Sequence, residues 1–279
     1  MRDNLKTILL FCCIAMQLIN LVSCQTVKVG NSSLQEMIVT VLNVGSADCI
    51  VIQTSNHTIM IDTGTDNESD AILSFLQENM ITTIDYLIIT HFDKDHVGGA
   101  DKIIDVVGIG QIIQPDYVRD SKQYKEYADA VKKKQTSVTK LTEDMEFALD
   151  DVEIAIYVPI ADFVVGDDNN YSLVTSVIHG ENTFLFAGDA EQIRLQELLD
   201  KEIGEHTFLK VPHHGEVEDN SEEFFVAVNP RYAVITCSIK EPAEDEVIEL
   251  LEGIGTEVFL VSDGTVTCMS DGTQISVSN

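Results

Sequence analysis

The sequence predicts an α/β protein in which two mixed β-sheets pack face to face and helices cover their outer faces, a four-layer αββα sandwich. Three observations predict this class. Apolar residues make up 44% of the 279 residues, enough for a sizeable core. Runs with strand and helix periodicity alternate along the chain. No proline-, glycine- and serine-rich stretch divides residues 37–279, so one domain is expected there.

The first half of this domain is expected to begin with three strands and then to alternate helix with strand. Gly, Asn and Ser separate the strand-like runs. A helix is expected over residues 69–79, where Ile72, Leu73 and Leu76 have helical spacing. The other expected elements are strands at 37–44, 49–53, 58–61, 86–90, 109–113, near Val138 and at 152–158, and helices from about Ala100 and over 122–134.

The second half repeats this alternation. The expected strands are 173–178, 183–186, 207–211, 232–236, 257–261, 265–269 and 274–277, and the expected helices are 190–200 and 244–252.

The N-terminus has the pattern of an export signal. Arg2 and Lys6 precede an apolar stretch of about 15 residues, which is short for a membrane-spanning helix. The stretch ends in Leu21-Val22-Ser23-Cys24, which resembles the lipobox of bacterial lipoproteins, whose cysteine is lipidated and becomes the mature N-terminus. An ordinary signal peptide or an uncleaved anchor is the alternative. We expect a signal peptide at 1–23, a tether at 24–36, and an exported protein, either lipid-anchored on the extracellular face of a membrane or secreted.

The charge balance is strongly acidic. The formal charge is −30, and removing residues 1–23 takes away Arg2, Lys6 and Asp3 and leaves −31. Such a surface repels polyanions, and the one basic stretch, at residues 132–134, is short. Tight sequence-independent binding of nucleic acid is therefore not expected. The three cysteines after Cys24 have the spacing of neither a disulfide framework nor a zinc ribbon.

A cluster of ionisable residues follows the apolar run at 86–90. His91, Asp93, Asp95 and His96 cannot lie inside a buried strand without charge compensation, so we expect them in the loop beyond it. A divalent cation would compensate the gathered carboxylates and imidazoles. The alternative is a solvated acidic loop.

Two later segments also end apolar runs in candidate ligands. Asp189 follows Gly188, which allows close backbone approach, although Asp189 could also cap the helix expected from Ala190. His213 and His214 close the run at 208–212, and neighbouring side chains on an extended backbone point in opposite directions. We therefore expect one of the two to bind metal. We favour His213 as the ligand and His214 as a catalytic group.

The order of these motifs resembles that of the metallo-β-lactamase superfamily. Its signature His-x-His-x-Asp-His stands here as His-x-Asp-x-Asp-His followed by Gly98 and Gly99, which resembles the hydrolase domain attached to the bacterial DNA-uptake protein ComEC and its free-standing relatives. The resemblance covers roughly residues 37–275, because three other segments agree in order: 41–48 through 61–64, 169–174 through 186–189, and 209–215.

This resemblance implies the αββα fold and a centre of two divalent metal ions. It places His91 and Asp93 at one metal position, Asp95 and His96 at the other, and Asp189 between them. It also implies supporting roles around the ligands for Asp62, Asn170 and Ser172, and Asp62 could also stabilise an Asx-turn.

Two positions depart from the family pattern. The third motif commonly supplies a histidine where this chain has residues 169–172, an Asn-x-Ser pattern shared with the ComEC-like branch. A late histidine before proline is replaced by Glu241 before Pro242, and Glu241 could bind metal or have no role.

The ligand set is rich in oxygen, so we expect Zn²⁺ or Mn²⁺. Two such ions would activate a water and polarise a phosphoryl or carbonyl oxygen, with Asp95 holding the water and His214 protonating the leaving group. We therefore expect an exported metal-dependent hydrolase of phosphodiester or phosphoester bonds, acting on small-molecule or oligonucleotide-like substrates. The alternatives are a surface binding protein that has lost turnover and a hydrolase of lactones or other carbonyl esters.

Overall fold

The computed structural model describes residues 34–160, 164 and 166–279, and residues 34–279 form one compact unit. The expected signal peptide, Cys24 and most of the expected tether lie outside the described residues, so those expectations stay predictions. Within the described ranges, no helix is long and apolar enough to cross a membrane.

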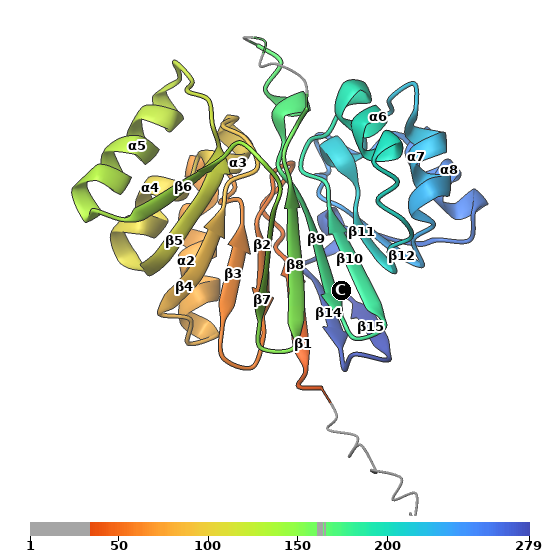
Figure 1. The fold of residues 1–279 in the computed structure, drawn as a ribbon, viewed down its shortest axis with the longest axis horizontal. Helices are drawn as coiled ribbons and strands as arrows, with labels where there is room; N and C mark the ends of the chain where they lie inside the picture. Colours follow the sequence, from red (N-terminus) through yellow and green to blue (C-terminus); the bar gives the residue numbers. More distant parts are fainter. Residues whose placement is uncertain (1–33, 161–163, 165) are drawn as a thin grey trace, which may run out of the picture. The chain divides into compact units, whose positions relative to one another are not determined.

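Two β-sheets form the centre of this unit (Figure 1). In sheet order, the first consists of β15 (Ile275–Ser278), β14 (Val266–Ser270), β1 (Met37–Val41), β2 (Ile50–Gln53), β3 (Thr58–Ile61), β4 (Thr83–Ile88), β5 (Gly108–Pro115) and β6 (Ser137–Leu141). The second consists of β13 (Glu257–Leu260), β12 (Tyr232–Ile235), β11 (Phe208–Lys210), β10 (Asn182–Phe186), β9 (Val174–His179), β8 (Val152–Tyr157) and β7 (Met145–Leu149).

Helices cover part of the outer face of each sheet (Figure 1). On the first sheet these are α2 (Ser69–Glu78), α4 (Ala100–Val106) and α5 (Lys122–Lys134), with the short α3 (Lys94–Val97) beside them. On the second they are α6 (Gln192–Asp200), α7 (Ser221–Val228) and α8 (Asp245–Gly253). Local chemistry sets some of these bounds: the Ser121 side chain accepts a hydrogen bond from the Tyr124 backbone N–H at the start of α5, and left-handed Gln135 ends that helix.

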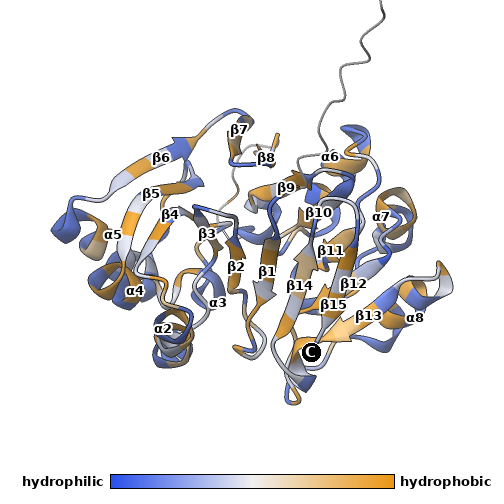
Figure 2. Cartoon of the chain, turned by 90° about the horizontal axis from the view of Figure 1, so that it is seen from below, coloured by the Kyte–Doolittle hydropathy of each residue, from blue (hydrophilic) through white to orange (hydrophobic). Residues whose placement is uncertain are grey.

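Three apolar layers hold the sandwich together (Figure 2). Successive side chains of a strand point to opposite faces, so Ile50 and Ile52 enter the layer between the sheets while Val51 enters the layer under the helices. Phe184, Phe186 and Phe208 fill the middle layer from the second sheet. The predicted four-layer αββα sandwich is confirmed.

Parallel pairing decides where the polar loops meet. Strands β3, β4 and β5 run parallel to one another in the first sheet, as do β10, β11 and β12 in the second. The loops that follow these strands therefore leave from their carboxyl ends.

Apart from short 3-10 turns, three described elements were not expected from the sequence: β7, α3 and α7. In β7, partly buried residues alternate with exposed ones, so its apolar signal is short and interrupted. Four of the eight residues of α7 are buried, and a compact apolar run of that length does not distinguish helix from strand.

Candidate metal centre

Four strand ends supply the centre. Asp62 follows β3, the segment from His91 to His96 follows β4, Asp189 follows β10, and His214 follows β11. Gly188 precedes Asp189 with a φ of +56°, and a β-carbon there would lie 3.0 Å from the Ser172 side chain, so the chain can turn this tightly only at glycine.

Three imidazoles turn their Nε2 atoms toward one carboxylate oxygen. The distance to Asp189 Oδ2 is 3.0 Å from His96 Nε2, 3.2 Å from His214 Nε2 and 4.0 Å from His91 Nε2. The His91 and His96 side chains are fully buried, so bulk water does not stabilise this gathering.

Oxygen atoms behind the rings hold the opposite nitrogens. His96 Nδ1 lies 2.8 Å from Asp62 Oδ2, and His214 Nδ1 lies 2.9 Å from the Thr236 carbonyl oxygen. Both oxygens accept hydrogen bonds, so Nδ1 is the protonated nitrogen of each ring and Nε2 faces the centre. His91 Nδ1 lies 3.0 Å from Thr90 Oγ1. This is the arrangement in which histidines present ligand atoms to a metal.

Without a metal, protons balance the buried carboxylates. Burial lowers the pKa of His214, but Asp189, Asp95 and Asp48 outweigh it and raise that pKa to about 10. Burial also opposes charge on His96, yet Asp189 and Asp62 raise the pKa of His96 well above its ordinary value. Burial and the neighbouring His96 hold the pKa of His91 well below its ordinary value.

The residues present fit a divalent cation. One ligand atom each from Asp95, His96, Asp189 and His214 lies within 4.8 Å of the others. His91 Nε2 and Asp189 Oδ1 are buried and have no hydrogen-bond partner in the described part of the chain. A bound cation would satisfy such groups, because buried polar atoms otherwise carry a desolvation cost.

Asp93 lies outside this group. Its carboxylate contacts the guanidinium of Arg119, which also lies 3.0 Å from Asp168 Oδ1. The predicted pairing of His91 with Asp93 at one metal position therefore stays a prediction: His91 faces the centre, while Asp93 is held by Arg119.

The structure places His214, rather than the favoured His213, beside Asp189. Both residues have positive φ, 44° and 51°, in the 3-10 turn Pro212–Gly215, so the extended backbone assumed for them is absent. His213 Nδ1 instead lies 3.7 Å from Glu191 Oε1 and 3.8 Å from Glu218 Oε1. One histidine of the pair, His214, thus faces the centre, and His213 lies in a second group of possible ligands with Glu191 and Glu218, so the choice of His213 as the ligand stays a prediction.

The three predicted supporting residues differ in how directly they contact the candidate ligands. Asp62 accepts hydrogen bonds from the Thr90 backbone N–H and from His96, and therefore fixes a ligand ring. Ser172 Oγ accepts a hydrogen bond from the Asp189 backbone N–H. Asn170 Oδ1 accepts one from the Arg194 backbone N–H, which places Asn170 at the start of α6 rather than against a candidate ligand.

Lys210 was missed by the sequence reasoning. Its fully buried ammonium lies 2.5 Å from Asp48 Oδ2, 3.0 Å from the Gly188 carbonyl oxygen and 3.6 Å from Asp189 Oδ1. Asp48, in the loop between β1 and β2, also accepts a hydrogen bond from Thr236 Oγ1 at 2.7 Å. The signal was present, because a lysine inside an apolar strand requires a buried anion.

A hollow of about 340 Å³ lies over the centre. Asp95, Asp189, His213, His214 and Glu241 are among the residues that line it. Glu241 therefore lies at the site.

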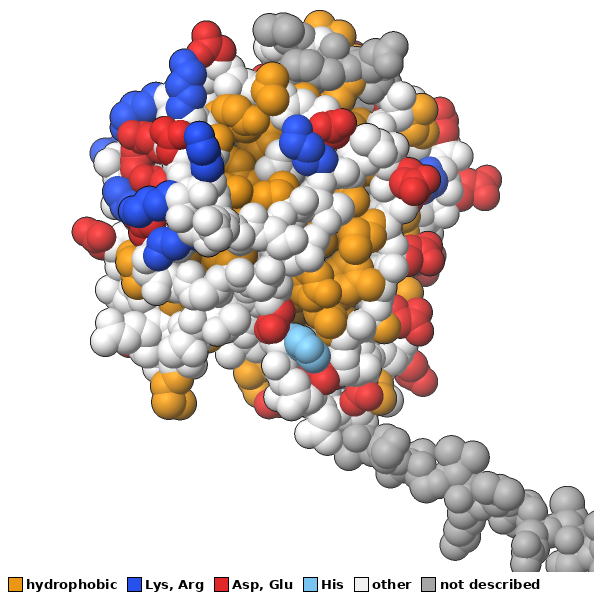
Figure 3. All heavy atoms as spheres, turned by 60° about the vertical axis from the view of Figure 1, so that its left-hand side comes forward, with side chains coloured by type: hydrophobic (Ala, Val, Ile, Leu, Met, Phe, Trp, Pro, Cys, Tyr) orange, Lys and Arg blue, Asp and Glu red, His pale blue; other side chains and the backbone are white. Residues whose placement is uncertain are grey.

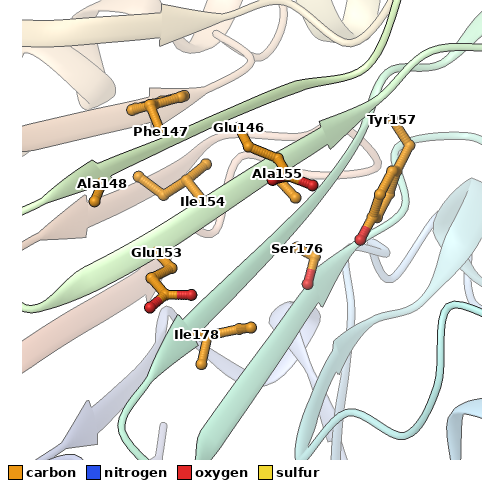
Figure 4. Close-up of a pocket in the computed structure, with 9 residues that line it drawn as sticks. All are labelled: Glu146, Phe147, Ala148, Glu153, Ile154, Ala155, Tyr157, Ser176 and Ile178. Atoms are coloured by element: carbon orange, nitrogen blue, oxygen red, sulfur yellow. The ribbon is translucent and has the colours of Figure 1, made fainter.

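A larger hollow of about 410 Å³ lies elsewhere, on the outer face of β7, β8 and β9 (Figure 4). Glu146, Glu153, Tyr157 and Ser176 contribute its polar groups. Ser176 Oγ lies 2.9 Å from His206 Nε2, so each satisfies the other in the sheet. None of the candidate ligands lines this hollow, and we exclude it from the candidate site.

The two-sheet sandwich with histidines and aspartates at its strand ends defines a metallohydrolase-type fold and site. The family model of the metallo-beta-lactamase superfamily matches residues 42–238, and the chain belongs to this superfamily.

The curated relatives confirm the resemblance to the competence-protein branch. The chain is 27% identical over 200 residues to Recombination protein 2 of Haemophilus influenzae, covering 70% of this chain and 23% of that protein. It is 26% identical over 167 residues to ComE operon protein 3 of Bacillus subtilis, covering 59% and 21%. It is also 26% identical over 217 residues to Competence protein ComA of Neisseria gonorrhoeae, covering 75% and 29%. The chain thus spans less than a third of the length of these relatives.

Solved structures show the same fold at low identity. The metallo-beta-lactamase fold protein YhfI from Bacillus subtilis aligns with a TM-score of 0.57 at 12% identity, over 88% of this chain and 100% of that chain. A diphosphatase from the PhnP family aligns with a TM-score of 0.52 at 12% identity, over 85% and 98%.

Proposed function

We propose that this protein is a metal-dependent hydrolase of phosphodiester or phosphoester bonds. The observation that carries the proposal is the convergence of three Nε2 atoms on Asp189 Oδ2, with oxygen atoms holding two of the opposite ring nitrogens as hydrogen-bond acceptors. Divalent ions, Zn²⁺ or Mn²⁺, would supply an activated water and polarise the phosphoryl oxygen when bound.

In this proposal the chain's own residues divide the work. His96, Asp189 and His214, with His91 beside them, hold the ions. Asp95 is partly exposed and lines the hollow, with Oδ2 3.5 Å from His214 Nε2, so it is placed to orient the attacking water as well as to bind a metal ion.

We propose His213 as the residue that donates a proton to the leaving group. The sequence alone favours His214 for this role. His214 lies in the ligand group with Asp95, His96 and Asp189, whereas His213 lines the hollow with its side chain 16% exposed and groups with Glu191 and Glu218 instead. Its Nδ1 lies 3.7 Å from Glu191 Oε1 and 3.8 Å from Glu218 Oε1, so the ring is positioned at the hollow, where it can meet a leaving oxygen.

The hollow favours small substrates. Its volume of about 340 Å³ suits one phosphodiester with its two substituents, and the strongly acidic chain repels further phosphates. A diphosphatase shares the fold, which makes phosphate chemistry compatible with this scaffold without fixing the substrate.

The test is turnover of bis(p-nitrophenyl) phosphate by residues 25–279 loaded with Mn²⁺ or Zn²⁺. We expect turnover in the wild type and its loss in Asp95→Asn, with the folded state of the variant checked by circular dichroism. His57→Gln is the matched control, because His57 pairs with Asp150 at 3.1 Å and belongs to none of the candidate metal groups.

The outcomes separate the alternatives. Hydrolysis of lactones without hydrolysis of diesters would favour the carbonyl-ester reaction. Metal binding without turnover of either class would favour a binding protein, and failure to bind either ion would end the enzyme proposal.

We also propose that the protein is exported and anchored through lipid on Cys24, on the sequence pattern at residues 21–24. Detergent partitioning of wild type against Cys24→Ala tests the anchor. Equal partitioning would leave a cleaved signal peptide as the better account.

A further inference from the structure

Arg119 joins two carboxylates at the edge of the candidate centre. Its guanidinium contacts Asp93 and lies 3.0 Å from Asp168 Oδ1. Asp168 is only 4% exposed, so its charge requires a partner, whereas the Asp93 side chain is 30% exposed and faces the hollow over the centre.

The two halves of the centre therefore differ. Asp95, His96, Asp189 and His214 already present ligand atoms within 4.8 Å of one another. His91 Nε2 is fully buried, lies 4.0 Å from Asp189 Oδ2 and has no hydrogen-bond partner among the described residues, while Asp93 lines the hollow and is held by Arg119.

We propose that Arg119 competes with the second metal ion for Asp93, so that the centre fills in order. The inference rests on the proposed function, because it requires that the site bind metal. The first ion binds at Asp95, His96, Asp189 and His214. The second binds at His91 and Asp93 only when Asp93 exchanges Arg119 for the cation, since one carboxylate oxygen cannot serve both positive groups at full strength.

Asp168 allows Asp93 to exchange Arg119 for the cation without leaving the guanidinium unpaired. Because Asp168 is buried and pairs with the same guanidinium, Arg119 keeps a partner after Asp93 leaves it. The guanidinium then remains beside the hollow, with donors released from Asp93, where it is placed to bind a phosphoryl oxygen of the substrate.

The experiment is a Mn²⁺ titration of the metal-free full chain, followed by electron paramagnetic resonance of the free ion. We expect two steps in the wild type, the second weaker than the first. Arg119→Gln should tighten the second step by up to about fivefold, the range expected for losing one partly exposed ion pair, and should leave the first step unchanged. Asp93→Asn should abolish the second step alone.

Two further variants separate competition from general effects. Lys94→Gln removes the same charge from an exposed lysine that lines the same hollow, and it should change the second step less than Arg119→Gln does. If Arg119→Gln destabilises the fold by leaving Asp168 without its cation, Arg119→Gln with Asp168→Asn removes both charges and repeats the test.

The results distinguish this inference from the proposed function. An unchanged or weaker second step in Arg119→Gln, or an equal effect of Lys94→Gln, would overturn the inference while the hydrolase proposal stands. Absence of both steps in the wild type would overturn the proposed function itself.

Discussion

Single residues of the centre act through charges that bulk water does not screen. Lys210 is fully buried and Asp48 is 1% exposed, and their ion pair joins the end of β11 to the loop between β1 and β2. A third contact, from Lys210 to the Gly188 carbonyl oxygen, ties the turn that carries Asp189 to the same ammonium. Lys210 thus holds together loops from both sheets.

Lys210→Met should destabilise the metal-free protein by about 3–5 kcal/mol, because it leaves the Asp48 carboxylate buried without its cation. Urea unfolding checks the value. Lys210→Met with Asp48→Asn removes both charges, so part of the stability should return. A loss below about 1 kcal/mol in the single variant would mean that water reaches Asp48.

The same buried charges predict how metal binding depends on pH. The pKa of His214 is raised to about 10 in the metal-free protein, above the ordinary value of about 6.5, so its proton stabilises the fold fully below about pH 6.5. That contribution is lost as pH rises through about 10. A metal must displace this proton, and the affinity should therefore rise about tenfold per pH unit for each proton released, between about pH 6 and pH 8.

Chelator competition at several pH values measures this slope. His214→Gln removes one of the displaced protons and should reduce the slope by about one unit, although binding itself weakens. His57→Gln should keep the wild-type slope. An affinity that does not change with pH would show that the imidazoles are neutral before metal binds.

The secondary structure around each site residue determines whether that residue could be predicted from the sequence. Asp95, His96 and Asp189 were predictable because each follows an apolar run that must end where a charge appears. Which of His213 and His214 faces the centre could not be predicted, because it depends on the left-handed backbone of both residues in the turn after β11. Positive φ is expected from sequence mainly at glycine, and neither residue is a glycine. The role of Arg119 could not be predicted for another reason. Arg119 lies in the loop between β5 and α5, distant from Asp93 in the sequence, and the two residues come into contact only in the folded protein.

Long elements inside the fold could be predicted from the sequence better than short strands at the edges of the sheets. Helix α5 matches its expected bounds because a serine cap, an amphipathic pattern and a terminal lysine run agree over its full length. Strand β7 lies at the end of the second sheet and pairs only with β8 among the described strands, so few contacts constrain its pattern. Short edge strands carry a weak sequence signal for this reason.

The whole molecule is strongly acidic, and much of its basic charge is paired within the fold. The formal charge is −30, and the lysines that gather on one side of the face in Figure 3, where α5 lies, are largely paired with acids. Lys133 lies 2.8 Å from Asp105 Oδ2, and Lys122 lies 3.2 Å from Glu126 Oε2. The basic run, which alone would attract a polyanion, is therefore partly neutralised within the fold.

This distribution predicts that long DNA is a poor substrate for the proposed hydrolase. Each phosphate beyond the one at the centre meets the acidic surface, and salt screens that repulsion over roughly 8 Å at physiological ionic strength. Raising the salt concentration should therefore help cleavage of a long polyanion or leave it unchanged, whereas a basic nuclease loses activity. Parallel assays of duplex DNA and bis(p-nitrophenyl) phosphate across a salt series make the comparison, and the small diester, which carries a single charge, is the control. Efficient DNA cleavage that collapses as salt is added would instead require a positive groove on this protein or on a partner.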